Sequence, residues 1–152
     1  MIYKVNPSTF NLDYSKYSNN INDKYLKIIK DDNKNKMIIC CIDNNEYNIT
    51  SFIIYRKVIL KNEINFIILL ISVHEEFRNN GYGKIILDEF IEYINLNTKT
   101  EKNINIIIHS LESSENFFIN YGFEKIKNSR FLKIYEGWKS NSDILLYKFN
   151  IK

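Results

Sequence analysis

The residues best suited to chemistry are a short run with two glycines, Arg78-Asn79-Asn80-Gly81-Tyr82-Gly83, which follows an apolar stretch and opens an amphipathic one. The first turn of a helix has unpaired amide N–H groups and the positive end of the helix dipole. Gly81 and Gly83 have no side chain, so phosphate oxygens can approach those amides closely. Arg78 and Lys84 can add positive charge. The run therefore predicts a cradle for a diphosphate at the start of a helix.

Two other interpretations of this run are open. The glycines could simply allow a tight turn between a strand and a helix. A dinucleotide-binding loop is also rich in glycine, but it follows a strand of a parallel unit and requires a carboxylate about 20 residues further on. The strands before this loop are expected to form an antiparallel meander, which disfavours nicotinamide binding.

The elements on either side of the loop are the clearest in the chain. Ile64–Val73 is nearly all apolar, which predicts a central strand buried on both faces. Tyr82–Leu96 has apolar residues at the spacing of one helix face, namely Leu87, Phe90, Ile91 and Ile94. Apolar patterns predict further strands at 1–5, 37–42, 49–60, 104–109, 123–127 and 144–149, a turn at 43–45, one or two helices within 10–30 and a short helix at 113–121.

This order predicts an α/β or α+β fold with a mixed, mostly antiparallel central sheet flanked by helices. The 152 residues suit one domain, expected to span 1–152. The net charge of +3 comes from interspersed lysines and carboxylates, which disfavours nucleic-acid binding. We find neither an apolar run long enough for a membrane span nor a signal peptide. Cys40 and Cys41 are adjacent in a predicted strand, so they should point to opposite faces, and they suit a reducing compartment. The expectation is a cytoplasmic protein without a metal.

A second run is Phe117-Phe118-Ile119-Asn120-Tyr121-Gly122-Phe123, which predicts a short helix ending at a glycine. Together with the glycine loop, it resembles the GNAT superfamily of acetyltransferases. The acetyl-CoA loop of that family has the form Arg/Gln-x-x-Gly-x-Gly/Ala after a strand that ends in Val, and its second signature is aromatic-aromatic-x-x-x-Gly-Phe. The resemblance implies the GNAT fold, acetyl-CoA as co-substrate and acetyl transfer to an amine.

Within the superfamily the chain is most similar to glucosamine-6-phosphate N-acetyltransferases, from about Met37 to Phe123. The stretch 52–59 resembles that family's Ile-Ile-Glu-Arg-Lys-Leu-Ile, and 81–88 resembles its Gly-Leu-Gly-Lys-Leu-Leu-Ile-Asp. Three departures concern the acceptor site. The central-strand Ile-Glu-Asp-Ile is Ile68-Leu69-Leu70-Ile71 here, a strand-end carboxylate is His109, and the tyrosine beside the leaving sulfur is Phe118.

The resemblance implies which residues contact the ligands. For acetyl-CoA they are Ile71, Ser72, Val73, Arg78, Asn79, Asn80, Gly81, Tyr82, Gly83, Lys84 and Phe118. For an amino-sugar phosphate they are Lys57, Val58, Ile59, Leu60, Leu69, Leu70, Ile104, Asn105 and Lys148. The family forms homodimers in which a partner subunit often reaches positions 104 and 105, so a homodimer is expected.

Acid–base roles fall to few side chains. His109 is the candidate general base, because a neutral imidazole titrates near neutrality and this residue ends a predicted strand; a capping or core role is equally open. Tyr121 is a candidate proton donor to the sulfur, although packing before Gly122 is the simpler interpretation. Thiolates leave readily, so an acid is not required. His74, expected to be more exposed, is a weaker candidate.

Two other functions remain open on the sequence. A protein lysine or N-terminal acetyltransferase is one alternative, although histone-type members rely on a central-strand glutamate where this chain has Ile67. A non-enzymatic acetyl-CoA-binding module is the other, suggested by the missing carboxylates and by Phe118. Acetyl transfer to glucosamine 6-phosphate is the function that the whole pattern favours.

Overall fold

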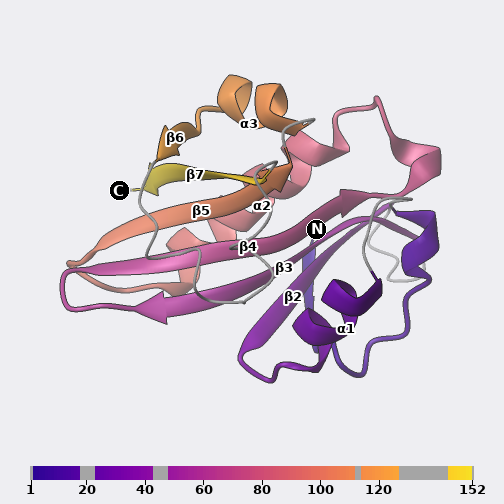
Figure 1. The fold of residues 1–152 in the computed structure, drawn as a ribbon, viewed down its shortest axis with the longest axis horizontal. Coiled ribbons are helices and arrows are strands. Elements are labelled where there is room, and N and C mark those ends of the chain that lie inside the picture. The colour runs from indigo at the N-terminus through magenta and orange to yellow at the C-terminus, as the bar shows by residue number, and fades with distance from the viewer. Residues whose placement is uncertain (1, 18–22, 43–47, 112–113, 127–143, 152) are drawn as a thin grey trace. The chain divides into compact units, whose positions relative to one another are not determined.

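The structure is a computed structural model that describes residues 2–17, 23–42, 48–111, 114–126 and 144–151 (Figure 1). Two compact units make up the chain. Unit 1 comprises Met1–Lys57 and Leu69–Glu101, and unit 2 comprises Val58–Ile68 and Lys102–Lys152. Strands β3 (Ile49–Ile59) and β4 (Glu63–Val73) contribute residues to both. Each unit is described by itself.

The strands of unit 1 follow the order β1-β2-β3-β4. Strand β1 (Ile2–Val5) pairs antiparallel with β2 (Asn35–Cys41), and β2 pairs antiparallel with β3. The β2–β3 register shifts between Cys40 and Cys41, and both cysteines are buried and outside any disulfide bond. The predicted meander before the glycine loop is therefore present, which agrees with the argument against a dinucleotide-binding unit.

Aromatic contacts show how the two faces of β3 are covered. Phe52 and Tyr55 are three residues apart, so their side chains point to opposite faces. The ring of Phe52 lies 5.4 Å from that of Tyr14 and 5.1 Å from that of Tyr17, at the 3₁₀ turn Tyr14–Lys16. On the other face, the ring of Tyr55 lies 4.9 Å from that of Phe90 in helix α2.

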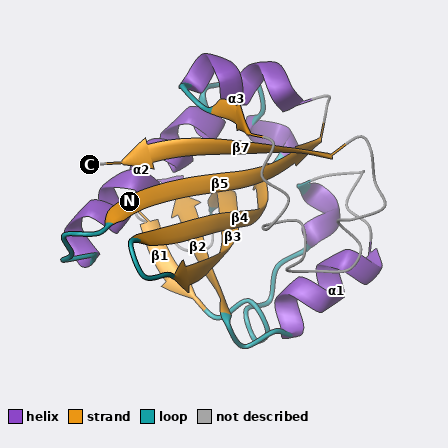
Figure 2. Cartoon of the chain, turned by 60° about the vertical axis from the view of Figure 1, so that its left-hand side comes forward, coloured by secondary structure: helices purple, strands orange, loops and turns teal. Residues whose placement is uncertain are grey.

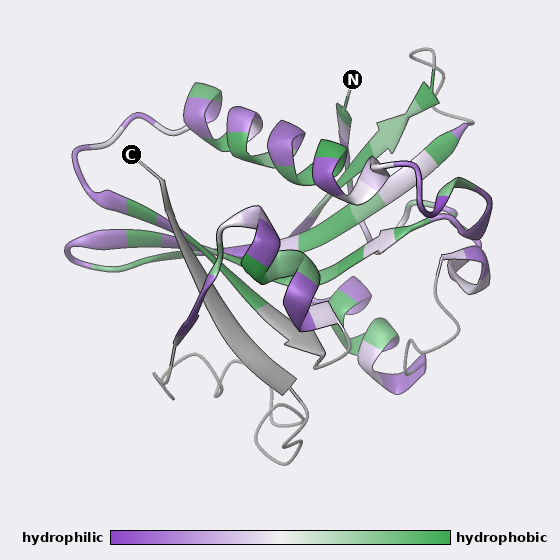
Figure 3. Ribbon diagram, turned by 90° about the horizontal axis from the view of Figure 1, so that it is seen from above, coloured by the Kyte–Doolittle hydropathy of each residue, from purple (hydrophilic) through white to green (hydrophobic). Residues whose placement is uncertain are grey.

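Helix α2 (Tyr82–Asn97) confirms the strongest sequence prediction. It buries Ile86, Leu87, Phe90 and Ile94, and Figure 3 shows its apolar side turned toward the strands and its polar side outward. In Figure 1, α1 (Asp23–Asp31) lies in front of β2 and α2 lies behind the strands of unit 1. No described helix is long and apolar enough to cross a membrane.

The strands of unit 2 follow the order β4-β5-β7-β6. Strand β5 (Asn103–Leu111) pairs parallel with β4 from Glu63↔Asn103 to Ile68↔Ile108. Strand β7 (Ile144–Ile151) runs antiparallel beside β5 (Figure 2). Strand β6 (Glu124–Ile126) pairs with β7, and helix α3 (Glu115–Tyr121) precedes it.

The fold class predicted from the sequence is confirmed, and two details differ. Burial along β4 extends only from Ile64 to Leu69, while Leu70–Val73 are half-buried, so the apolar run is not buried throughout. The strand predicted at 37–42 begins earlier, at Asn35, and ends at Cys41. The predicted turn at 43–45 and the segment 129–141 lie outside the described residues.

Candidate functional site

The last residues of β4 present their peptide groups in a defined direction. The amide of His74 donates to the carbonyl of Thr50 in β3 at 2.8 Å, so it faces β3. Peptide groups alternate along a strand, so those of Leu69, Ile71 and Val73 face away from β3. Two contacts agree with this direction. The Tyr25 hydroxyl donates to the carbonyl of Leu69 at 2.9 Å, and Arg78 Nε donates to that of Val73 at 3.3 Å.

This alternation separates the three residues that were predicted to hold the cofactor. Ile71 and Val73 turn their N–H groups away from β3, so an extended ligand that pairs with them must lie on the side opposite β3. The peptide group of Ser72 faces β3 instead, and its hydroxyl donates to the carbonyl of Tyr17 at 2.6 Å. The backbone N–H groups of Ile71 and Val73 are therefore the ones that can bind a ligand. The Ser72 side chain instead holds the main chain of Tyr17.

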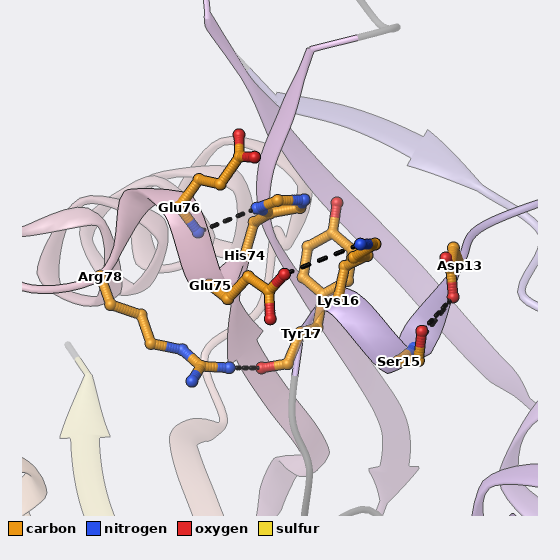
Figure 4. Close-up of polar contacts among 8 residues, drawn as sticks. All are labelled: Asp13, Ser15, Lys16, Tyr17, His74, Glu75, Glu76 and Arg78. Carbon is orange, nitrogen blue, oxygen red and sulfur yellow. Dashed lines mark hydrogen bonds and ion pairs between the residues drawn. The ribbon is translucent and has the colours of Figure 1, made fainter.

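Tyr17 ties the strand end to the glycine loop. Its carbonyl accepts from the hydroxyl of Ser72. It also accepts from the guanidinium of Arg78 (Figure 4). Its hydroxyl donates to the carbonyl of Ile49 at 3.1 Å. Burial, with smaller effects from neighbouring charges, raises the pKa of Tyr17 to about 12, so this phenol is neutral over the physiological range. Arg78 thus uses two of its five N–H donors on carbonyls, and contact of its guanidinium with a diphosphate stays a prediction.

The glycine loop needs left-handed backbone at two positions. Asn79 has φ 65° and Gly81 has φ 83°. A Cβ at Gly81 would meet no atom within 4 Å, so glycine is favoured there by backbone handedness and not by space. The Asn80 side chain braces the loop, because its amide donates to the carbonyl of Arg78 at 3.0 Å. Left-handed residues of this kind occur in backbone concavities that bind anions.

The start of α2 is open to an anion. Gly81 caps the helix without a side-chain hydrogen bond, and the first turn has no acidic residue. The first intrahelical bond runs from the amide of Ile85 to the carbonyl of Gly81, at 3.0 Å. The amides of Tyr82, Gly83 and Lys84 consequently point out of the helix at its positive end. The Lys84 side chain is exposed and pairs with Asp88 at 2.9 Å.

His74 follows β4 directly. It is half-buried, and its Nδ1 accepts from the amide of Glu76 at 3.1 Å. The imidazole lies edge-on to Tyr17, with ring centroids 5.1 Å apart, and its centroid is 5.5 Å from that of Phe77. The hydrogen bond from the Glu76 amide to His74 Nδ1 caps the 3₁₀ turn Glu75–Phe77, which connects β4 to the glycine loop.

The second sequence signature forms a helix end in unit 2. Gly122 has φ 124°, and its amide donates to the carbonyls of Phe118 and Ile119 at 3.2 and 3.1 Å. Phe118 is buried edge-on to Phe123, with ring centroids 5.6 Å apart. Tyr121 is half-buried against the same Phe123 ring, at 5.9 Å. The glycine therefore ends α3 as a left-handed cap, and cofactor contact by Phe118 stays a prediction.

The other predicted catalytic and acceptor residues are spread over several elements. His109 lies in β5 opposite Leu146 of β7, and Lys148 lies opposite Ile107. Lys57 is exposed, as is Ile59 at 60%, while Val58, Leu60 and Leu70 are half-buried and Leu69 is buried. The roles of His109 and Tyr121 in catalysis, and of these side chains in acceptor binding, stay predictions.

Two of the predicted acceptor contacts have structural partners within unit 2. Ile104 is buried, and Asn105 is only 1% exposed. The Asn105 amide donates to Glu63 Oε2 at 3.1 Å and to Asn65 Oδ1 at 3.0 Å. These contacts hold the start of β4 against the start of β5, so both residues have a packing role whatever the acceptor.

Sequence reasoning missed Tyr17 and Tyr25. Both reach β4 from the polar N-terminal region, for which the sequence predicted only one or two helices within 10–30. Tyr17 takes part through its main-chain oxygen, which every residue type has, so the sequence gives no sign of this role. Tyr25 donates to a carbonyl 44 positions away, so no local spacing indicates the pair. Among the residues that the structure describes, no group of three His, Cys, Asp or Glu could hold a metal ion.

Comparison with known proteins identifies the fold. No family model matches the chain, and no curated protein matches it. Among solved structures, it is similar to a GNAT-family acetyltransferase from Staphylococcus aureus, with a TM-score of 0.63 and 19% identity over 100% of both chains. A GNAT-family acetyltransferase from Elizabethkingia anophelis with acetyl-CoA bound gives 0.61 and 19% over 99% of this chain and 97% of that one. Tetrahymena GCN5 gives 0.63 and 14% over 87% and 78%.

These similarities show that the chain has the GNAT fold. The fold implied by the glycine loop and the aromatic signature is thereby confirmed.

Proposed function

We propose that the protein is an acetyl-CoA-dependent N-acetyltransferase. The observation that supports this most strongly is the arrangement at the end of β4. Ile71 and Val73 face away from β3, and the chain then turns through left-handed Gly81 into the open first turn of α2. An extended amide-containing chain ending in a diphosphate fits this sequence of strand edge and helix start.

The chemistry requires little from side chains. Backbone N–H groups at the strand end can hold the cofactor arm and stabilise the oxyanion that develops on the thioester carbonyl. Because backbone groups do this work, the missing central-strand carboxylates do not remove it. The proton of the attacking amine needs an acceptor, for which His109 is our candidate. A thiolate is a tolerable leaving group, so Phe118 in place of a tyrosine does not prevent the reaction.

For the acceptor we propose glucosamine 6-phosphate, giving N-acetylglucosamine 6-phosphate. The support is the sequence resemblance over residues 37–123 and the exposed Lys57, which can contribute a cation for the phosphate. A homodimer in the cytoplasm accompanies this proposal as the family expectation. Leu69 and Leu70 stand where that family has two carboxylates, so the acceptor is tested separately from acetyl transfer.

Measuring thiol release from acetyl-CoA tests acetyl transfer and the identity of the acceptor separately. The purified protein is given glucosamine 6-phosphate, glucosamine, a lysine peptide or a peptide with a free N-terminus. We expect much faster release with the phosphorylated sugar than with glucosamine, because only the former carries the anion that cations can hold. Release only with a peptide would overturn the acceptor and retain the acetyltransferase. Acetyl-CoA binding without release under any condition would indicate a non-enzymatic module.

A further inference from the structure

Helix α1 places one side chain on the edge of β4 to which the proposed function assigns the cofactor. The Tyr25 hydroxyl donates to the main-chain carbonyl of Leu69 at 2.9 Å, across 44 positions of sequence. That carbonyl faces away from β3, as do the peptide groups of Ile71 and Val73. Tyr25 is half-buried, and all four residues belong to unit 1. The Tyr25 oxygen therefore lies on the same edge of β4 as the groups proposed to bind acetyl-CoA.

The position of this oxygen limits how far a ligand can pair along the edge. In a β-ladder, the amide nitrogen of an added strand lies about 2.9 Å from the carbonyl oxygen that accepts from it. The Tyr25 oxygen is at that distance from the Leu69 oxygen. The Leu69 carbonyl thus already has a donor from this chain, and a phenol stands beside it. Strand-like pairing of a ligand is consequently expected to include Ile71 and to stop before Leu69.

Arg78 limits the same edge at its other end. Its Nε donates to the carbonyl of Val73 at 3.3 Å. Between the carbonyls of Leu69 and Val73, the outward-facing groups are the N–H and C=O of Ile71 and the N–H of Val73. An extended ligand can match them with amide carbonyls on the N–H groups and an amide N–H on the C=O. The arm of acetyl-CoA, which contains a pair of amides, has this arrangement of groups.

The direction of the arm follows from the place of the diphosphate. Its proposed cradle at residues 78–84 comes after the C-terminal end of β4, so the arm runs back along the strand from Val73 to Ile71. The acyl end then points toward Leu69. Two residues of a strand span about 6.6 Å, so the Tyr25 hydroxyl lies within a few atoms of the end of the arm.

We propose that Tyr25 ends the ligand-binding edge of β4 and thereby restricts the acyl group of the cofactor to a short one, acetyl in preference to butyryl. The proposal rests on the proposed function, because it takes an acyl-CoA as the ligand of this edge. It adds a specificity-determining residue from α1, a helix to which the glycine loop and the aromatic signature assign no role.

Calorimetry with acetyl-CoA and butyryl-CoA tests this without an acceptor. We expect the unmodified protein to bind butyryl-CoA about tenfold more weakly, because extra methylenes that do not fit a closed site cost affinity. Tyr25→Phe removes only the hydroxyl and should reduce the difference to about threefold, and Tyr25→Ala should remove most of it. Tyr14→Phe is the matched control, because it removes a phenol hydroxyl whose contact is Met37 Sδ in β2, at 3.8 Å. That variant should keep the full difference.

Failure of the proposal can be told from failure of the proposed function. Equal affinity for the two thioesters in the unmodified protein would overturn the role of Tyr25 and retain acetyl-CoA binding. A Tyr25 that only anchors α1 would, when changed to Phe, lower both affinities by the same factor, and this unchanged ratio would overturn the proposal too. Tyr25→Phe alone decides this point if Tyr25→Ala does not fold. Absence of acetyl-CoA binding would overturn the proposed function and the role of Tyr25 with it.

Discussion

Arg78 and Tyr17 are 61 residues apart in the sequence, and the guanidinium of Arg78 donates to the main-chain carbonyl of Tyr17. The same group reaches the carbonyl of Val73, and Ser72 donates to the oxygen of Tyr17 as well. The strand end and the glycine loop are therefore held by one short network, and the orientation of both depends on it.

Arg78→Lys should weaken acetyl-CoA binding about tenfold, or roughly 1.4 kcal/mol. A lysine ammonium cannot reproduce the planar fork that reaches two carbonyls while leaving donors for the diphosphate. Calorimetry on the folded variant measures the change. The matched control is Arg56→Lys, because Arg56 contacts Asp32 and Asn35 at the start of β2. That variant should lose stability and keep its acetyl-CoA affinity; equal affinity loss in both would contradict the assignment.

Gly83→Glu should also reduce acetyl-CoA affinity at least tenfold. Gly83 lies in the first turn of α2, where a side chain and a negative charge would meet the diphosphate. Glutamate near a helix N-terminus is favourable to the helix itself, so the fold should be retained. Asn95→Glu adds the same charge near the other end of the helix and is expected to leave affinity intact. If Gly83→Glu bound acetyl-CoA normally, the helix start would not be the diphosphate site.

His109→Ala should lower kcat by about 100-fold, within the usual contribution of a general base. The proposed diphosphate contacts come from residues 78–84, which this substitution leaves in place, so acetyl-CoA affinity should not change. Steady-state kinetics with the best acceptor and calorimetry with acetyl-CoA separate the two effects. Normal turnover in the variant would assign deprotonation to water or to backbone.

Tyr14 should make the protein less stable at high pH. Burial raises the pKa of Tyr14 to about 12 from an ordinary value near 10. The folded state therefore favours the neutral phenol, so this stabilisation is complete below pH 10 and is lost as pH rises from 10 to 12. The loss is at most about 2–3 kcal/mol. Denaturant unfolding between pH 8 and 11.5 should show a smaller decrease in Tyr14→Phe than in the unmodified protein, and parallel decreases would contradict this.

Asn65 and Asn105 should depend on each other for stability. Both are buried, the Asn65 amide donates to Glu63 Oε1 at 3.2 Å, and the Asn105 amide contacts Asn65 and Glu63. Asn105→Ala leaves acceptors without a donor and should lower the free energy of unfolding by about 1–3 kcal/mol. The double alanine variant should lose less than the sum of the single losses, as measured by denaturant unfolding. Additive losses would mean that the two amides act independently.

Much of the fold could be predicted from the sequence, because strand and helix patterns depend on local spacing. Helix α2 was predicted to within one residue at its C-terminal end, since its buried residues repeat every three to four positions. The start of β2 was missed because Asn35 is polar but buried. Its side chain donates a hydrogen bond to the carbonyl of Ile29, and a search for apolar residues does not find such a position. At the site, the loop residues were found by type, whereas the opposite directions of Ser72 and its neighbours depend on strand pairing.

The oxygen shared by Ser72 and Arg78 belongs to the main chain of Tyr17, so every amino acid at that position would supply it. Position 17 can therefore change over evolution without removing the acceptor on which the loop depends. Its aromatic ring has a different role, because it packs against Phe52 and His74. The donors have no such freedom, since only their side chains make the bonds. Among homologues of this chain, we thus expect positions 72 and 78 to vary less than position 17.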